Sequence, residues 1–162
     1  MDHTQADTMK YLEKLSGAWI GKGTGAFPTI VPFQYRETLT FTPGEGKAYL
    51  HYEQRTWRKD ESGREMASHW ESGFWRVLGD NEVELACAQV GRVEVARGRL
   101  VPTENGFSLR LQSSLFGNDA RMQQTLREFI LRGSTLRYTL QMQTTAVPVL
   151  AMHVQAELRR NG

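Results

Sequence analysis

The sequence predicts an all-β protein, a closed antiparallel up-and-down barrel of about ten strands preceded by a short helix. Three observations support this fold class. Apolar and polar residues alternate along many segments, which is the pattern of strands with one buried face. Turn-forming residues recur about every ten residues, as in a sheet of hairpins. No segment has the length and period of a crossover helix, and a long antiparallel sheet removes its exposed edges by closing.

Length and composition favour a single domain over residues 1–162, with residues 1–7 expected to be poorly ordered. The net charge is +2, and basic residues are scattered among acidic ones, so we expect no nucleic-acid partner. The chain has no apolar run long enough to span a membrane, and we expect no secretory signal, because the first residues lack a basic and an apolar region. The single cysteine, Cys87, cannot form an intrachain disulfide. These properties favour a cytoplasmic protein without a membrane partner.

The first element that we expect is a short helix from Thr8 to Leu15. Met9, Leu12 and Leu15 share one face of it, and Asp7 or Thr8 is a candidate N-cap. A helix in this place would plug or flank one end of a barrel.

The next element is a first strand with an unusual glycine pattern. Gly17, Trp19, Gly21, Gly23 and Gly25 occupy every second position, which places all five on one face of a strand. Glycines on one face leave room for a bulky group or let the strand bend sharply. We therefore expect a strand that curls around a small barrel, with Trp19 buried near one end.

Later segments show clear period-two alternation and clear turns. Apolar residues alternate with polar ones in the segments 82–87, 107–112 and 136–142. The turn signals that separate the strands contain Gly, Pro, Asn, Asp and Ser. They are Pro43–Gly46, Asp60–Gly63, Gly79–Asn81, Glu104–Gly106, Gly117–Asp119 and Gly133–Ser134.

The glycine-rich strand also carries a family resemblance. Gly17–Gly23 reads Gly-Ala-Trp-Ile-Gly-Lys-Gly and resembles the Gly-X-Trp-X-Gly-X-Gly signature of the nitrobindins, heme proteins whose barrel is similar to that of fatty-acid-binding proteins. Phe27 departs from the family pattern, in which Tyr is usual. Further matching blocks cover nearly the whole chain after the first dozen residues. They are Gly25–Ile30, Phe33–Glu37, Thr56–Trp57, His69–Gly73 with Arg76, and His153–Leu158.

The resemblance implies a heme enzyme. It implies that the protein binds heme b without a covalent link, with His153 as axial iron ligand and catalytic residue. It also implies that the protein binds nitric oxide and isomerises peroxynitrite to nitrate at ferric heme. Such an isomerisation is Lewis-acid chemistry and needs no protein nucleophile.

His153 can be interpreted in two ways from the residues alone. Imidazole is a common ligand of heme iron, but a lone strand histidine can also be hydrogen-bonded at a barrel rim. Strict alternation places His153 on the face opposite an apolar set, namely Leu150, Met152, Val154, Ala156 and Leu158. If His153 points inward, that apolar face needs cover from the helix or from a second subunit, which would make a homodimer. A β-bulge near Met152 is the other solution.

The resemblance adds further cofactor-binding candidates. It places His69 on the distal side of the heme and Thr29 beside it; alternatively, His69 pairs with Glu71 and Thr29 satisfies its own turn. Arg127 and Arg137 precede the last strand, and either guanidinium could pair with heme propionates at the barrel mouth. A solvated strand face is the alternative for both arginines.

Other classes of function lack their motifs. The chain has no Cys-X-X-Cys-His for covalent heme, no zinc spacing, no phosphate loop and no nucleophile elbow. The remaining alternative is a carrier of a small apolar ligand, as in lipocalins and fatty-acid-binding proteins, because the fold does not fix the function. Such a carrier would need neither His153 nor His69.

Overall fold

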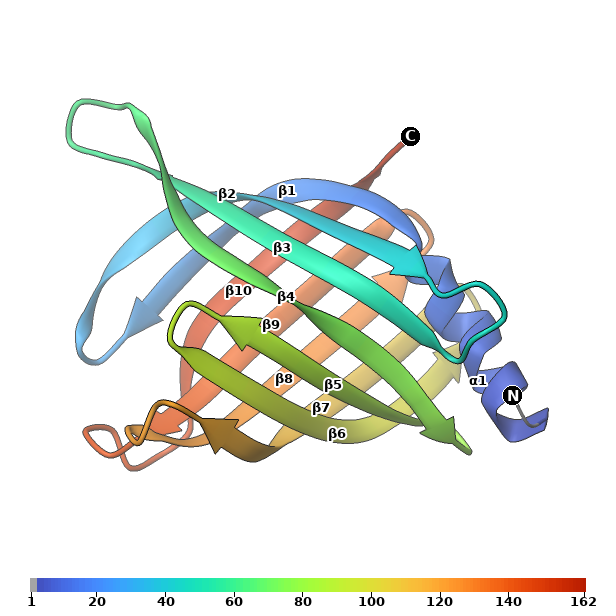
Figure 1. Ribbon diagram of the computed structural model, residues 1–162. Coiled ribbons are helices and arrows are strands. Elements are labelled where there is room, and N and C mark those ends of the chain that lie inside the picture. Colours follow the sequence, from blue (N-terminus) through green and yellow to red (C-terminus); the bar gives the residue numbers. More distant parts are fainter. Residues whose placement is uncertain (1–2) are drawn as a thin grey trace.

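The computed structural model describes residues 3–162, which form a closed barrel of ten antiparallel strands (Figure 1). Consecutive strands are neighbours in the sheet, and β1 pairs with β10 to close it. The predicted all-β barrel is confirmed, and the predicted turns lie at or between strand ends. The strands are β1 (Gly17–Phe27), β2 (Ile30–Pro43), β3 (Tyr49–Lys59), β4 (Glu65–Gly79), β5 (Glu82–Gln89), β6 (Arg92–Thr103), β7 (Gly106–Gly117), β8 (Met122–Arg132), β9 (Thr135–Thr144) and β10 (Ala151–Asn161).

A helix closes one end of the barrel (Figure 1). It is α1 (His3–Leu12), followed by a 3-10 turn (Glu13–Leu15), and Met9, Leu12 and Leu15 are buried in the barrel core. The helix begins earlier than the expected Thr8. The Thr8 hydroxyl is inside the helix, where it donates to the Thr4 carbonyl oxygen at 3.0 Å and accepts from the Asn81 N–H at 2.9 Å.

The expectation that residues 1–7 are poorly ordered stays a prediction. Residues 3–7 are helical, while residues 1 and 2 lie outside the described part of the chain. Within residues 3–162, no helix combines the length and the apolar character that a membrane crossing requires.

The glycines of β1 allow close contacts rather than leaving empty space. A Cβ at Gly23 would lie 2.2 Å from the Tyr35 ring, and one at Gly25 would lie 2.1 Å from the Phe33 ring. Aromatic side chains of β2 therefore fill the space that the glycines leave. Trp19 is fully buried as predicted, and its indole N–H donates to the Leu15 carbonyl oxygen at 2.7 Å.

The last strand contains the bulge that the sequence left open. The register of β10 against β9 shifts between Met152 and Val154, so His153 is the extra residue. His153 and Val154 both line the interior cavity, while Met152 is 44% exposed. Ala156 and Leu158 are buried in the barrel. The apolar face of β10 therefore does not point outward as a whole, so no second subunit is needed to cover it, and the homodimer stays a prediction.

Candidate functional site

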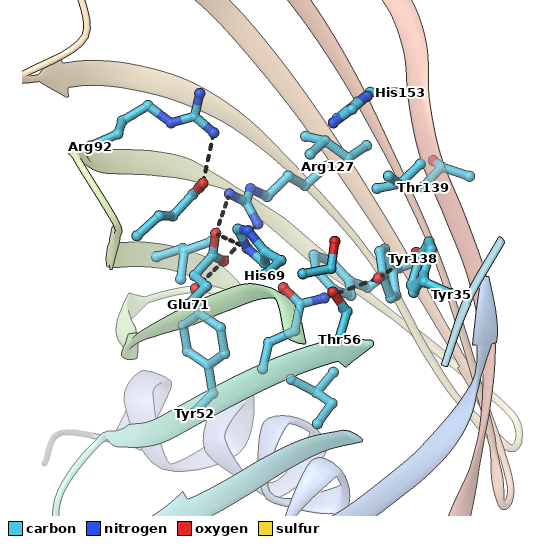
Figure 2. A pocket seen from close by; sticks show the side chains of 18 of the residues that line it. Tyr35, Tyr52, Thr56, His69, Glu71, Arg92, Arg127, Tyr138, Thr139 and His153 are labelled. Carbon is cyan, nitrogen blue, oxygen red and sulfur yellow. Dashed lines mark hydrogen bonds and ion pairs between the residues drawn. The ribbon is translucent and has the colours of Figure 1, made fainter. Parts of the chain in front are cut away.

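The barrel contains a cavity of about 280 Å³ at the end opposite α1 (Figure 2). Side chains of β2 to β6 and β8 to β10 line it. Three predicted site residues meet there: His69 from β4, Arg127 from β8 and His153 from β10. The sequence therefore identified side chains from three separate strands that converge on one space.

His153 is held by contacts on two sides of its ring. Its Nδ1 lies 3.3 Å from the carbonyl oxygen of Ala26 on β1. The Phe27 and Phe33 rings meet the imidazole edge-on, with centroid distances of 5.7 and 6.5 Å. The bulge turns the side chain inward, and these contacts fix the ring orientation.

The same contacts set the chemical state of His153. A carbonyl oxygen only accepts hydrogen bonds, so Nδ1 must carry the proton and Nε2 keeps a free lone pair. Burial lowers the pKa of His153, an effect that the hydrogen bond to Ala26 only partly offsets. A neutral imidazole with one nitrogen anchored to a carbonyl is the form that binds metals.

His69 lies beside a buried carboxylate. Its Nε2 is 3.6 Å from Oε2 of Glu71, so the sequence-based expectation of a His69–Glu71 pair is met in geometry. The His69 side chain is 36% exposed and lines the cavity, whereas Glu71 is almost fully buried. His69 therefore presents a half-exposed imidazole to the cavity against a fixed negative charge.

A buried ion network forms the charged wall of the cavity. The guanidinium of Arg127 donates to Glu71 at 3.0 Å and to Glu94 at 2.8 Å (Figure 2 shows the Glu71 contact). The Tyr52 hydroxyl donates to Glu71, and the Thr125 hydroxyl donates to Glu94. Burial alone would raise the pKa of Glu71, but Arg127 and His69 outweigh it and hold this pKa well below its usual range.

The network shows where Arg127 lies, while its predicted contact with heme propionates stays a prediction. The side chain is neither on a solvated strand face nor free at the mouth, because it is buried and paired with two carboxylates. Arg137 does lie on the outside, where its exposed guanidinium pairs with Glu157 at 2.7 Å. Thr29 is exposed in the turn between β1 and β2 and is not among the described residues that line the cavity.

Sequence reasoning missed three groups near the cavity: Glu94, Arg92 and Glu37. Glu94 shares the inward face of β6 with the buried Ala96, a period-two signal that was present in the sequence. Arg92 lines the cavity with a side chain that is 17% exposed. Glu37 is fully buried next to cavity-lining tyrosines, and its place in the matching block Phe33–Glu37 was the available signal.

This fold and site define a class of protein, a small β-barrel with an interior cavity that a histidine lines. Comparisons with known proteins narrow the class. Residues 8–160 match the family described as "THAP4-like, heme-binding beta-barrel domain". The chain belongs to this family, which confirms the resemblance to nitrobindins.

Relatives of known name cover most of the chain. It is 40% identical over 148 residues to "Peroxynitrite isomerase Rv2717c" of Arabidopsis thaliana, and the alignment covers 91% of this chain and 85% of the relative. It is 38% identical over 152 residues to "Peroxynitrite isomerase 1" of Rhodococcus jostii, and that alignment covers 93% of this chain and 82% of the relative. The crystal structure of Rv2717c from M. tuberculosis superimposes with a TM-score of 0.86 at 32% identity, covering 96% of this chain and 98% of that one.

Proposed function

We propose that the protein binds heme b through Nε2 of His153, binds nitric oxide and isomerises peroxynitrite to nitrate. The observation that carries the proposal is the state of His153: inward at a bulge, neutral, with Nδ1 anchored and Nε2 free. Membership in a heme-binding family and relatives named peroxynitrite isomerases support it.

The residues around the cavity fit a heme. Phe33 and Leu140 offer apolar contacts for the macrocycle. Arg58 and Arg92 line the cavity with partly exposed side chains and are the better partners for propionates, because Arg127 is already paired with two buried carboxylates. Thr29 lies in the turn between β1 and β2, outside the described cavity lining. Its contact with the heme stays a prediction.

Each histidine has its own role in the proposed reaction. When bound, a ferric heme would supply Lewis acidity to the reaction. His153 would hold the iron through Nε2, and His69, which lines the same cavity, would contact the small ligand without ligating iron. The reaction requires no nucleophile of the protein, and the cavity has the polar wall of Glu71 and Arg127 rather than a catalytic triad.

The two histidines also bear on the alternative function. A carrier of a small apolar ligand needs neither His153 nor His69, yet both side chains line the cavity. Their place in the cavity therefore favours the heme enzyme over the apolar carrier.

Reconstitution with hemin tests the proposal. The wild type should show a Soret band, His153→Ala should lose most of its heme affinity while keeping its fold, and His69→Ala should keep heme with altered rates of ligand binding. His51→Ala is the matched control, because His51 bonds to Ser72 at 2.9 Å and lies outside the cavity lining. The loaded wild type should raise the nitrate yield from peroxynitrite. Wild-type heme affinity in His153→Ala would contradict the assignment.

A further inference from the structure

A second carboxyl group, Glu37, is buried behind the cavity in a different environment from that of Glu71. It is fully buried on β2, and in the described part of the chain no ion pair reaches it. One carboxyl oxygen accepts a hydrogen bond from Nε2 of Gln54 at 2.7 Å, and the other accepts from the Tyr138 hydroxyl at 2.6 Å. Glu37 is therefore a buried acid that neutral donors alone stabilise.

The cross-strand neighbours of Glu37 on β1 and β3 are uncharged. Its partner on β1 is Gly21, which has no side chain, and its partner on β3 is Thr56. Glu71 on β4 is the charged group that acts on it, and it repels a second negative charge. Burial, with this repulsion, raises the pKa of Glu37 to about 7 although the Tyr138 and Gln54 hydrogen bonds lower it.

Hydrogen bonds connect Glu37 to the cavity. The Tyr138 hydroxyl lies 2.9 Å from the hydroxyl of Tyr35, and both tyrosines line the cavity (Figure 2). Glu37 itself is not among the lining residues. Along the hydrogen bonds the order is Glu37, Tyr138 and Tyr35, and both tyrosines face the cavity.

The hydrogen bonds among Glu37, Tyr138 and Tyr35 can be arranged in two ways, one for each protonation state of Glu37. A tyrosine hydroxyl has one proton and two lone pairs. When Glu37 is ionised, Tyr138 donates to it, so Tyr35 must donate to Tyr138 and its free lone pair faces the cavity. When Glu37 is protonated, it donates to Tyr138, Tyr138 donates to Tyr35, and Tyr35 presents its proton to the cavity.

Gln54 stabilises both arrangements. Its amide donates to Glu37 at 2.7 Å and to the Tyr138 oxygen at 3.0 Å, and neither contact needs the tyrosine proton. The two arrangements thus differ by the proton on Glu37 and by the direction of the Tyr138 and Tyr35 O–H bonds, and every hydrogen bond among the four side chains is made in both.

We propose that Glu37, Tyr138 and Tyr35 form a proton relay between a buried carboxyl group and the ligand in the cavity. In one transfer, Glu37 gives its proton to Tyr138, Tyr138 gives its own to Tyr35, and Tyr35 gives its own to a basic atom of the ligand. Each hydroxyl gains one proton and loses one, so the net result is a carboxylate at Glu37 and a protonated ligand. The reverse direction takes a proton from a ligand that enters as a neutral acid.

The relay specifies a chemical class of ligand beyond the heme itself. It suits a small anion that enters the cavity as its conjugate acid and is bound after losing the proton. Because the relay is a property of the protein without heme, it can be tested apart from the proposed function.

Time-resolved infrared spectroscopy after a pH jump tests the relay on the heme-free protein. The signal is the carbonyl stretch of protonated Glu37, assigned by its loss in Glu37→Gln or, if that variant fails to fold, by ¹³C labelling of glutamate. In the wild type this band should titrate with a midpoint within about one unit of pH 7. Tyr35→Phe should keep the band but slow its appearance by about a hundredfold, since positioned proton-transfer groups contribute at least this much.

Controls distinguish the relay from a buried acid that exchanges by another route. Tyr138→Phe should slow protonation like Tyr35→Phe, while Tyr49→Phe should leave it unchanged, because Tyr49 packs on Phe74 away from the cavity lining. Protonation of Glu37 at the wild-type rate in Tyr35→Phe would overturn the relay. The absence of any carboxyl band that titrates near neutrality would overturn it as well.

Discussion

Arg127 is the residue on which most of the buried charge depends. It lies between Glu71 and Glu94. Glu71 also accepts a hydrogen bond from the Tyr52 hydroxyl, and Glu94 accepts one from the Thr125 hydroxyl. Buried ion pairs contribute little net stability, but removing one partner leaves an uncompensated buried charge. Loss of Arg127 should therefore lower the stability of the protein by more than the intact network contributes to it.

We expect Arg127→Met to lower the free energy of unfolding by roughly 3–5 kcal/mol at pH 7, because two carboxylates lose their cation. The loss should shrink at acidic pH, where an unpaired carboxylate can take up a proton. Urea unfolding at several pH values measures both effects. Arg110→Met is the matched control: Arg110 pairs with Glu128 at 3.6 Å on the surface, and its loss should cost at most about 1 kcal/mol. Equal effects of the two changes would contradict the prediction.

The sequence could not reveal this network in advance. Period-two alternation assigns a residue to one face of its own strand, and on this basis Glu94 could have been placed inside. It does not show which side chains from distant strands will meet. Arg127 contacts Glu71 across 56 positions of the chain and Glu94 across 33, and only the closed barrel brings them together.

At the scale of elements, β1 and β10 show what sequence patterns can and cannot decide. The alternation of glycine and Trp19 predicted a first strand with a buried indole, and both are confirmed. The pattern around His153 predicted either a bulge or an exposed apolar face. Register depends on pairing with β9, which a single strand does not encode, so the structure was needed to identify the bulge.

Trp19 joins two elements, and its loss should destabilise the barrel end that α1 closes. The indole is fully buried, donates to the Leu15 carbonyl oxygen and lies under the Arg160 guanidinium at 4.4 Å. We expect Trp19→Ala to lower the free energy of unfolding by about 3–5 kcal/mol. Chemical denaturation measures this, with Trp70→Ala as control, because Trp70 is 53% exposed. A midpoint unchanged by Trp19→Ala would refute the argument.

At the scale of the whole molecule, the two ends of the barrel have different roles. The helix and Trp19 close one end with apolar packing, while the cavity at the other end holds His153, His69 and the ion network. Turn spacing was enough to predict a closed meander, because closure is the general solution for exposed edges. The cytoplasmic location and the homodimer concern partners and compartments outside the barrel and stay predictions.

The two buried acids should give the stability of the whole molecule a distinct pH dependence. Glu71 has a lowered pKa in the folded state, so its stabilisation is present above its unfolded pKa and is lost as the pH falls below about 4. Glu37 has a raised pKa of about 7, so the folded state binds its proton more tightly than the unfolded chain does. Its contribution is greatest below pH 4.5, the ordinary value, and is lost as the pH rises through about 7.

The variant Glu37→Gln isolates this second effect, because it keeps the buried polar group and removes its titration. Relative to Glu37→Gln, the wild type should lose up to about 3 kcal/mol of unfolding free energy as the pH rises from 4.5 to about 7. Urea unfolding of both proteins without heme across this range provides the measurement. Glu128→Gln serves as control for the substitution itself, since Glu128 is half exposed and lies outside the cavity lining. If the difference between wild type and Glu37→Gln is the same at every pH, Glu37 does not hold a proton near neutrality.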